Sequence, residues 1–165
     1  MTNTDTTGTK TTQPRMANPA TILPQAYKGI GNLLAASASG GVPASTIELV
    51  ALRVSQLNGC AACIQGHVVS GPTVGLTASQ MVGLPAFRES PYFDEAEKAA
   101  LELADALTLV AGAPDAVPDE LWRAVTKHYD ETQVAALIVA IATHNLFNRM
   151  NIAVREDAEA PFWTR

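Results

Sequence analysis

The sequence predicts an all-α protein of a single domain, and this prediction rests on three observations. Apolar residues recur at helical spacing through most of the chain. No segment shows the sustained period-two alternation that a half-buried strand requires. The chain has 165 residues, which is within the usual range for one domain. We therefore expect a compact bundle of six to seven helices over residues 18–165.

The first segment of the chain differs from the rest in composition. Residues 1–17 are rich in threonine, with glutamine, asparagine, glycine and proline, and carry no apolar periodicity. Such a segment cannot bury enough apolar surface to offset the entropy of ordering it. We expect a disordered tail here.

Two helices are expected before the cysteines. The first runs from about Pro19 to the double glycine at 40–41, with apolar residues at helical spacing. The second begins near Pro43, because proline suits the first turn of a helix. Asn58-Gly59 is a turn signal that can end this second helix and start a new one, with Asn58 near the N-cap position.

The helices after the cysteines are marked by capping boxes. In a capping box, a first polar side chain and an acid or amide three residues later satisfy free N–H groups at a helix start. A further helix is expected from Pro118 to about His128, with Trp122 as a core anchor and His128 on the surface. The three boxes are Thr77-x-x-Gln80, Asp94-x-x-Glu97 and Asp130-x-x-Gln133.

The last expected helix carries several polar residues in an apolar setting. His144 is interpreted as a buried histidine with a satisfied hydrogen bond, since that is the common state of a histidine on such a helix. Asn145, Asn148 and Arg149 are interpreted as a network between helices. The alternative has Arg149 fixing the orientation of Glu48 or of a loop.

The stretch from Glu48 to His67 contains both cysteines, Cys60 and Cys63. Residues three and four apart share a helix face, so the cysteines are candidates for a disulfide and His67 lies beside Cys63. A helix start just before Cys60 would also lower a thiol pKa. The stretch predicts a thiol-redox site. Two alternatives are half of a zinc site, which needs two more ligands, and a pair of inert buried thiols.

Glu48 has a second interpretation of its own. Ser45 and Glu48 have the spacing of another capping box, in which the acid only caps the helix. From the local sequence, this structural role and a catalytic role are both open.

The order E-x6-S-x2-N-x-C-x2-C-x3-H resembles the signature of the carboxymuconolactone decarboxylase superfamily, in its alkyl hydroperoxidase D-like branch. The resemblance covers about residues 20–155. The downstream stretches at 75–77 and 148–149 also resemble that family's pattern. The residues that carry the central motif are Glu48, Ser55, Asn58, Cys60, Cys63 and His67.

The resemblance implies a thiol-dependent (alkyl) hydroperoxide reductase. In this family's scheme, Cys63 attacks the peroxide, and Cys60 resolves the resulting sulfenic acid as a disulfide. Glu48 and His67 form a proton relay to Cys63. The substrate is a small hydroperoxide and an external dithiol restores the thiols, so no bound cofactor or metal is implied. The resemblance also implies a homo-oligomer, either a trimer or a hexamer.

One position departs from the family pattern. Ala62 stands where members usually carry tyrosine or, in alkyl hydroperoxidase D itself, a relay histidine, and alanine cannot move a proton. Two alternatives therefore stay open. One is decarboxylation of a muconolactone-like acid, although members of that branch generally lack the cysteine pair. The other is a non-catalytic protein whose disulfide senses redox state and changes its assembly.

Composition limits the partners and the compartment. The net charge is −5 and there is no basic run, which argues against nucleic acid and against anionic membrane surfaces. The longest apolar run, Val134 to Ala142, is too short to span a bilayer, and no signal peptide is evident. We expect a cytoplasmic protein. Ala-rich helices that are apolar on more than one face argue against a monomer, and the terminal Phe162 and Trp163 suggest docking on a neighbouring subunit.

Overall fold

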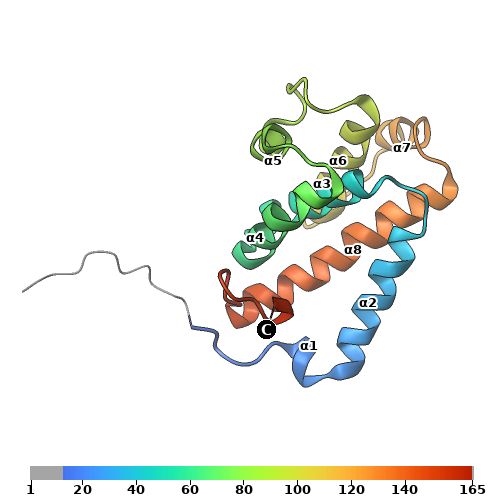
Figure 1. Cartoon of the computed structure of the whole chain (residues 1–165). Coiled ribbons are helices and arrows are strands. Elements are labelled where there is room, and N and C mark those ends of the chain that lie inside the picture. Colours follow the sequence, from blue (N-terminus) through green and yellow to red (C-terminus); the bar gives the residue numbers. More distant parts are fainter. Residues whose placement is uncertain (1–12, 165) are drawn as a thin grey trace, which may run out of the picture.

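The computed structural model of the chain describes residues 13–164, and that part consists of helices and loops without a strand (Figure 1). The all-α prediction is confirmed. The tail predicted over residues 1–17 lies mostly outside the described residues, so the proposed division at residue 18 stays a prediction. The helices are α1 Pro19–Ile22, α2 Pro24–Ala38, α3 Ala44–Asn58, α4 Ala61–Ser70, α5 Ala78–Gly83, α6 Glu95–Thr108, α7 Asp119–Thr126 and α8 Glu131–Val154, with short 3-10 turns η1 Gly71–Val74, η2 Leu84–Ala86 and η3 Phe162–Thr164.

The expected helices are all present, and one of them is split. The helix predicted from Pro19 is divided into α1 and α2 at Leu23, which has φ −112° and ψ 88°. Proline disfavours helical geometry in the residue before it, and Pro24 follows Leu23 directly. The periodicity of the apolar residues does not register this break.

The three predicted capping boxes are confirmed at the starts of α5, α6 and α8. In each, the cap side chain accepts from the backbone N–H three residues on, and the third side chain accepts from the cap N–H. Each cap of this kind stabilises its helix by about 1 kcal/mol.

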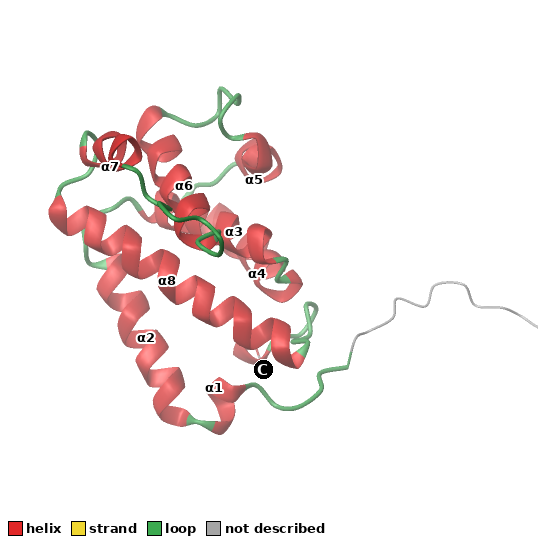
Figure 2. Ribbon diagram, turned by 180° about the vertical axis from the view of Figure 1, so that it is seen from behind, coloured by secondary structure: helices red, strands yellow, loops and turns green. Residues whose placement is uncertain are grey.

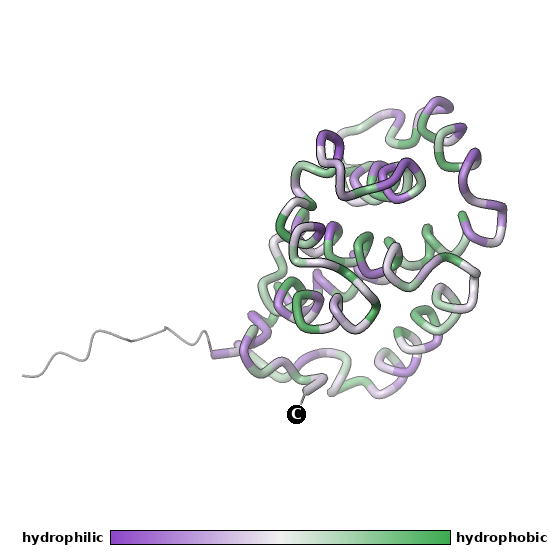
Figure 3. Tube along the Cα trace, turned by 45° about the horizontal axis from the view of Figure 1, so that its top comes forward, coloured by the Kyte–Doolittle hydropathy of each residue, from purple (hydrophilic) through white to green (hydrophobic). Residues whose placement is uncertain are grey.

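Helix α8 is the central element of the fold. It crosses the molecule between α2 on one side and α3 and α6 on the other, as the two opposite views show (Figures 1 and 2). Val50 and Val54 of α3 meet Leu137 and Ile141 of α8 in the main core, all at most 1% exposed. Hydrophilic and hydrophobic residues alternate along many of the helical turns (Figure 3), as expected for helices that bury one face.

A second cluster fills the space on the other face of α3, around Phe87. Arg53 and Arg88 lie over the ring of Phe87, at 5.6 and 4.5 Å from its centroid. Both guanidinium groups also donate to Asp105 of α6, the Arg53 pair at 2.6 and 3.0 Å. This packing joins α3, α6 and the loop before α6 into one layer.

Two expectations concerning α7 have different outcomes. His128 is exposed, as predicted. Trp122 is 44% exposed, so its assignment as a core anchor is wrong. The α7 region is anchored instead by Val125 and Tyr129, which are 0% and 5% exposed. The indole lies on the outside, in a shallow groove with Leu107 and other apolar residues.

Among the described residues, no helix combines the length and the hydrophobicity needed to cross a bilayer. Several large apolar side chains of the α1–α2 region are exposed, including Ile22, Leu23 and Leu33 at 51%, 59% and 43%. These side chains are compatible with the predicted homo-oligomer, which stays a prediction.

Candidate active site

The site begins at the break between α3 and α4. Gly59 has φ +70° and ψ 31°, a left-handed conformation that ends α3 and suits glycine. Cys60 then takes an extended conformation and caps α4, its sulfur accepting from the Cys63 N–H at 3.3 Å. The predicted break is confirmed, but Asn58 is not the N-cap. It is the last residue of α3, because the left-handed residue moves the new start by two positions.

Cys60 and Cys63 form a disulfide, with their Cα atoms 5.3 Å apart. Both side chains are buried, at 2% and 4% exposure. The two sulfurs have different surroundings. Cys63 lines a cavity of about 430 Å³, whereas Cys60 is not among the lining residues. Of the two cysteines, Cys63 is therefore the one placed to meet a small molecule.

The cavity is formed by α2, α3, α4, α8 and the C-terminal segment. Part of its lining is polar, with a carboxylate, two hydroxyls and two imidazoles in addition to Cys63. The rest is apolar and mostly aromatic. The polar residues are Glu48, His67, Ser70, Thr143 and His144, and the apolar ones are Tyr27, Ile30, Leu34, Phe147, Phe162 and Trp163, with two glycines between them.

Glu48 and His67 lie next to each other in the lining of this cavity. The Nδ1 of His67 lies 2.9 Å from Oε1 of Glu48, and the Ser70 hydroxyl donates to the same oxygen. Burial by itself would raise the pKa of Glu48. The hydrogen bonds from His67 and Ser70 and the charge of His67 outweigh it, so the pKa lies below its ordinary value. Glu48 is thus an ionised partner for the imidazole.

The capping-box interpretation of Glu48 is wrong. The N-cap of α3 is Pro43, with no side-chain cap hydrogen bond, and Ser45 already lies inside the helix. Glu48 therefore sits in the second turn, beyond the position from which an acid reaches back to the cap. Its side chain points to α4 instead.

His144 is a member of the site that the sequence interpretation did not place there. Its Nδ1 lies 2.8 Å from the Ala140 carbonyl, so the predicted satisfied hydrogen bond is present. Its ring also lines the cavity, 5.5 Å from the ring of His67. Burial, and then the charge of His67, lowers the pKa of His144 to about 4, so the ring is neutral at neutral pH. Ala62 is buried and does not line the cavity. The second imidazole of the cavity, that of His144, comes from α8.

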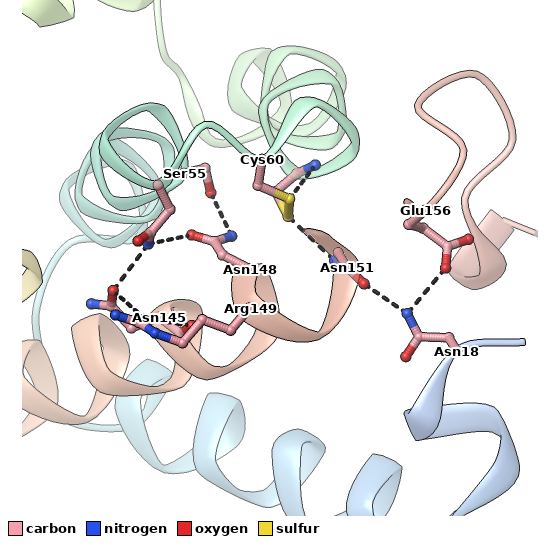
Figure 4. Close-up of a disulfide and its surroundings, with 10 residues drawn as sticks. Asn18, Ser55, Cys60, Asn145, Asn148, Arg149, Asn151 and Glu156 are labelled. Carbon is pink, nitrogen blue, oxygen red and sulfur yellow. Dashed lines mark hydrogen bonds between the residues drawn. A yellow bond between two sulfur atoms is a disulfide. The ribbon is translucent and has the colours of Figure 1, made fainter. Parts of the chain in front are cut away.

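The polar residues late in α8 tie this helix to the end of α3. The Asn58 amide donates to Oδ1 of both Asn145 and Asn148, at 2.9 and 3.0 Å. Asn148 donates to the Ser55 hydroxyl at 3.1 Å, and Arg149 donates to Asn145 (Figure 4). The predicted interhelix network is confirmed. The alternative is wrong, because the hydrogen-bond partner of Arg149 is Asn145 of the same helix and neither Glu48 nor a loop.

A second polar chain reaches the disulfide itself. Asn151 Nδ2 donates to Cys63 Sγ at 3.2 Å, and Asn18 Nδ2 donates to Asn151 Oδ1 at 2.8 Å. Asn18 Nδ2 also donates to the Glu156 carboxylate at 3.0 Å (Figure 4). No sequence pattern predicted these hydrogen bonds. Asn18 lies more than 130 residues before Asn151 and Glu156, and none of the three belongs to the motif, so no local signal marks them.

The C-terminal aromatic residues pack on their own chain. Phe147 of α8 lies 5.9 Å from the ring of Phe162 and 5.3 Å from that of Trp163, and Tyr27 of α2 lies 6.2 Å from Phe162. The expectation that these residues dock on a neighbouring subunit stays a prediction. They complete the apolar wall of the cavity.

The zinc interpretation requires further ligands near the cysteines. Across the part of the chain that the structure describes, His, Cys, Asp and Glu side chains do not gather in any group of three or more that could hold a metal ion. The two sulfurs are bonded to each other.

The fold and site together define a class: an all-α protein with a C-x-x-C redox pair at a helix N-terminus, beside a carboxylate–histidine pair. The sequence model of the carboxymuconolactone decarboxylase family matches residues 24–106. The chain belongs to the carboxymuconolactone decarboxylase family.

Three relatives indicate how far this similarity extends. The uncharacterized protein YdfG of Bacillus subtilis (strain 168) is 37% identical over 133 residues, which are 81% of this chain and 89% of YdfG. The uncharacterized protein YnjA of Escherichia coli (strain K12) is 30% identical over 109 residues, 65% of this chain and 57% of YnjA. The crystal structure of ATU0492 from Agrobacterium tumefaciens, a protein of unknown function provisionally described as the antioxidant defence protein AhpD, superposes with a TM-score of 0.79 at 31% identity. That match covers 87% of this chain and 96% of ATU0492.

Proposed function

We propose that this protein is a thiol-dependent hydroperoxide reductase, with Cys63 as the attacking thiol. The observation that carries the proposal is the position of Cys63 in the cavity wall, on the same face of α4 as His67 and its Glu48 partner. The provisional description of ATU0492 as an antioxidant defence protein supports the same activity.

The proposed reaction starts from the reduced pair. His67, held by Glu48, takes the proton of Cys63, because the thiolate and not the thiol is the nucleophile. The thiolate attacks the terminal oxygen of the hydroperoxide, and the O–O bond breaks. Cys63 becomes a sulfenic acid, and the departing alkoxide takes the proton from His67 to leave as an alcohol.

The second half of the reaction uses Cys60. Its thiol attacks the sulfenic sulfur of Cys63, which forms the disulfide and releases water. The structure has this disulfide, the oxidised end of the cycle. An external dithiol then reduces it by exchange, which needs no bound cofactor.

The apolar wall of the cavity bears on the choice of hydroperoxide. Tyr27, Phe147, Phe162 and Trp163 line the same cavity as Cys63, and its volume of about 430 Å³ is large enough for an organic molecule. Burying an alkyl or aryl group against these rings is favourable, whereas hydrogen peroxide gains nothing from them. The cavity therefore favours alkyl hydroperoxides.

The two cysteine variants test this proposal. We expect Cys63→Ser to abolish peroxide turnover, measured as thiol loss against added cumene hydroperoxide. Cys60→Ser should complete one turnover and leave a sulfenic acid that dimedone traps, since the resolving thiol is missing. In the wild-type protein, one equivalent of peroxide should remove both thiols, and a dithiol should restore them.

The two variants also check each other. If the two phenotypes exchange, Cys60 is the attacking residue. If the Cys63→Ser protein consumes peroxide at the wild-type rate, the assignment of Cys63 as the attacking thiol is wrong.

The alternatives fit the cavity less well. A carboxylated substrate calls for a cation, and the cavity lining includes neither lysine nor arginine. This disfavours decarboxylation of a muconolactone-like acid. The redox-sensing alternative predicts slow peroxide consumption with a change of oligomer on oxidation, so sizing of the reduced and oxidised protein separates it from the peroxidase.

A further inference from the structure

We propose that Asn151 is a further catalytic residue, which stabilises the Cys63 thiolate by donating an N–H hydrogen bond to its sulfur. The inference rests on the proposed function for its catalytic meaning, while its test on the thiol does not depend on peroxide. Asn151 Nδ2 lies 3.2 Å from Cys63 Sγ, and it comes from α8, across the interface from the helix that carries the cysteines.

The orientation of the Asn151 amide is fixed by the groups behind it. An amide side chain can present either its donor or its acceptor to a neighbour. Asn18 Oδ1 accepts from the backbone N–H of Ala20, which can only donate. The Asn18 NH₂ group must then face Glu156 and Asn151. Because it donates to Asn151 Oδ1, the Asn151 NH₂ group is turned toward the sulfur.

The hydrogen-bonded side chains of Asn18, Asn151 and Glu156 are shielded from solvent. Asn18, Asn151 and Glu156 are 2%, 1% and 8% exposed. A buried donor without an acceptor is costly, so the amide keeps its sulfur partner in the reduced state as well. A hydrogen bond to a charged acceptor is stronger than one to a neutral acceptor, so the contact strengthens when Cys63 becomes a thiolate. Asn151 therefore favours the nucleophilic form.

The other charged or titratable groups near Cys63 come from three elements. Glu48 belongs to α3, His67 to α4 and His144 to α8, and all three line the same cavity. Glu156 lies behind Asn18 and after α8, and it also accepts from the backbone N–H of Phe162 at 2.9 Å. The Asn151 amide donates directly to the sulfur, on the side of the Asn18–Glu156 chain, so its effect can be tested separately from that of the imidazoles.

The test measures the Cys63 thiol directly. In the Cys60→Ser protein, a single thiol titrates, and the ultraviolet absorbance of its thiolate gives its pKa. Adding Asn151→Leu removes the donor at similar volume. We expect the thiol pKa to rise by about one unit or more, and the rate of peroxide reaction at neutral pH to fall roughly tenfold.

Asn148→Leu is the matched control. Asn148 is on the same helix, 0% exposed, and hydrogen-bonded to Ser55 and Asn58, not to sulfur. This variant loses a buried amide as well but should leave the thiol pKa in place. An unchanged thiol pKa in Asn151→Leu, or an equal rise in both variants, overturns the proposal.

Asn151→Ala is a second variant for the same test. It removes the amide without placing new atoms against Cys63, so it tests the donor even where leucine does not fit. Asn18 is a positioning residue in this scheme, and the thiol pKa should rise in Asn151→Ala as it does in Asn151→Leu. If Asn151→Leu does not fold, this variant carries the test alone, and an unchanged pKa overturns the proposal.

The readouts keep the two proposals apart. If the wild-type protein does not consume peroxide but the thiol pKa depends on Asn151, the proposed function fails and the hydrogen-bond role stands. If the Asn151→Leu protein consumes peroxide at the rate of the protein with Asn151, and its thiol pKa is also unchanged, the proposed peroxidase function stands and the role of Asn151 fails.

Discussion

At the scale of single residues, the uncharged imidazole of His144 determines how many charges the cavity holds. A pKa of about 4 means that this imidazole carries no charge at neutral pH. Its neighbour His67 has Glu48 as a charge partner, and His144 adds no second positive charge beside it. The cavity thus combines one hydrogen-bonded carboxylate–imidazole pair with one neutral ring.

This neutral state predicts an acid-sensitive fold. The unfolded chain binds a proton at His144 near pH 6.5, whereas the folded chain does so only near pH 4. Between these values the unfolded state binds more protons. This contribution to the free energy of unfolding is therefore fully present above pH 6.5 and is lost as the pH falls toward 4. The loss should reach about 3 kcal/mol. Urea unfolding at neutral and acidic pH measures it.

His144→Gln should remove this part of the acid sensitivity. His128→Gln is the control, because His128 is exposed on the surface. The control should keep the wild-type dependence on pH. An identical dependence in all three proteins would assign the acid sensitivity to other groups.

Which site residues the sequence could predict depends on their spacing. Cys60, Cys63 and His67 lie within one motif, so their shared helix face followed from the spacing alone. His144 and Asn151 reach the site through the packing of α8 on α4. A helical period shows that a residue is buried, but not which helix lies opposite it. The sequence therefore could not predict that His144 and Asn151 belong to the site.

At the scale of elements, the break between α3 and α4 places the redox pair. Gly59 has φ +70°, and a Cβ built on it meets nothing within 4 Å. Gly59→Ala should therefore cost about 1 kcal/mol through the backbone alone. Any relaxation of that strain moves the start of α4, which carries both cysteines. We expect slower disulfide formation with peroxide along with the lower stability in urea.

Gly75→Ala is the matched control. Gly75 also has positive φ, +91°, with open space around its Cβ position, but it lies after η1 and outside the cavity lining. It should lose similar stability and form the disulfide at the wild-type rate. Equal slowing in both variants would contradict a specific role for the break.

Element boundaries show where sequence patterns are ambiguous. The polar pairs that open α5, α6 and α8 are true capping boxes, whereas Ser45 and Glu48 have the same spacing and lie inside α3. Pro43 already fixes that helix start, so the acid is free to face α4. The sequence likewise predicted a helix from Pro118 to about His128, but not how deeply Trp122 is buried.

At the scale of the whole molecule, the exposed apolar side chains of α1 and α2 bear on assembly. We predict a mass well above the 17.3 kDa of one chain by light scattering, because Ile22, Leu23 and Leu33 leave much apolar surface in water. Leu33→Glu should shift the protein toward the monomer, since Leu33 does not line the cavity but belongs to this exposed set.

Val82→Glu is the control for that change. Val82 is 82% exposed on α5, outside the α1–α2 region, and a charge there should leave the mass unaltered. A monomeric wild-type protein would contradict the predicted assembly.

The cavity draws its walls from both ends of the described chain, and this has a consequence during synthesis. The ribosome releases Cys63 about 100 residues before Trp163, which corresponds to roughly 5 to 20 s at usual elongation rates. For most of that interval the thiols are without Asn151 and without the aromatic residues of α8 and the C-terminal segment. The two cysteines of the nascent chain can still react with each other, however, because they are only three positions apart in sequence. Oxidative damage to the unfinished chain can therefore end in the same reversible disulfide that the finished protein forms.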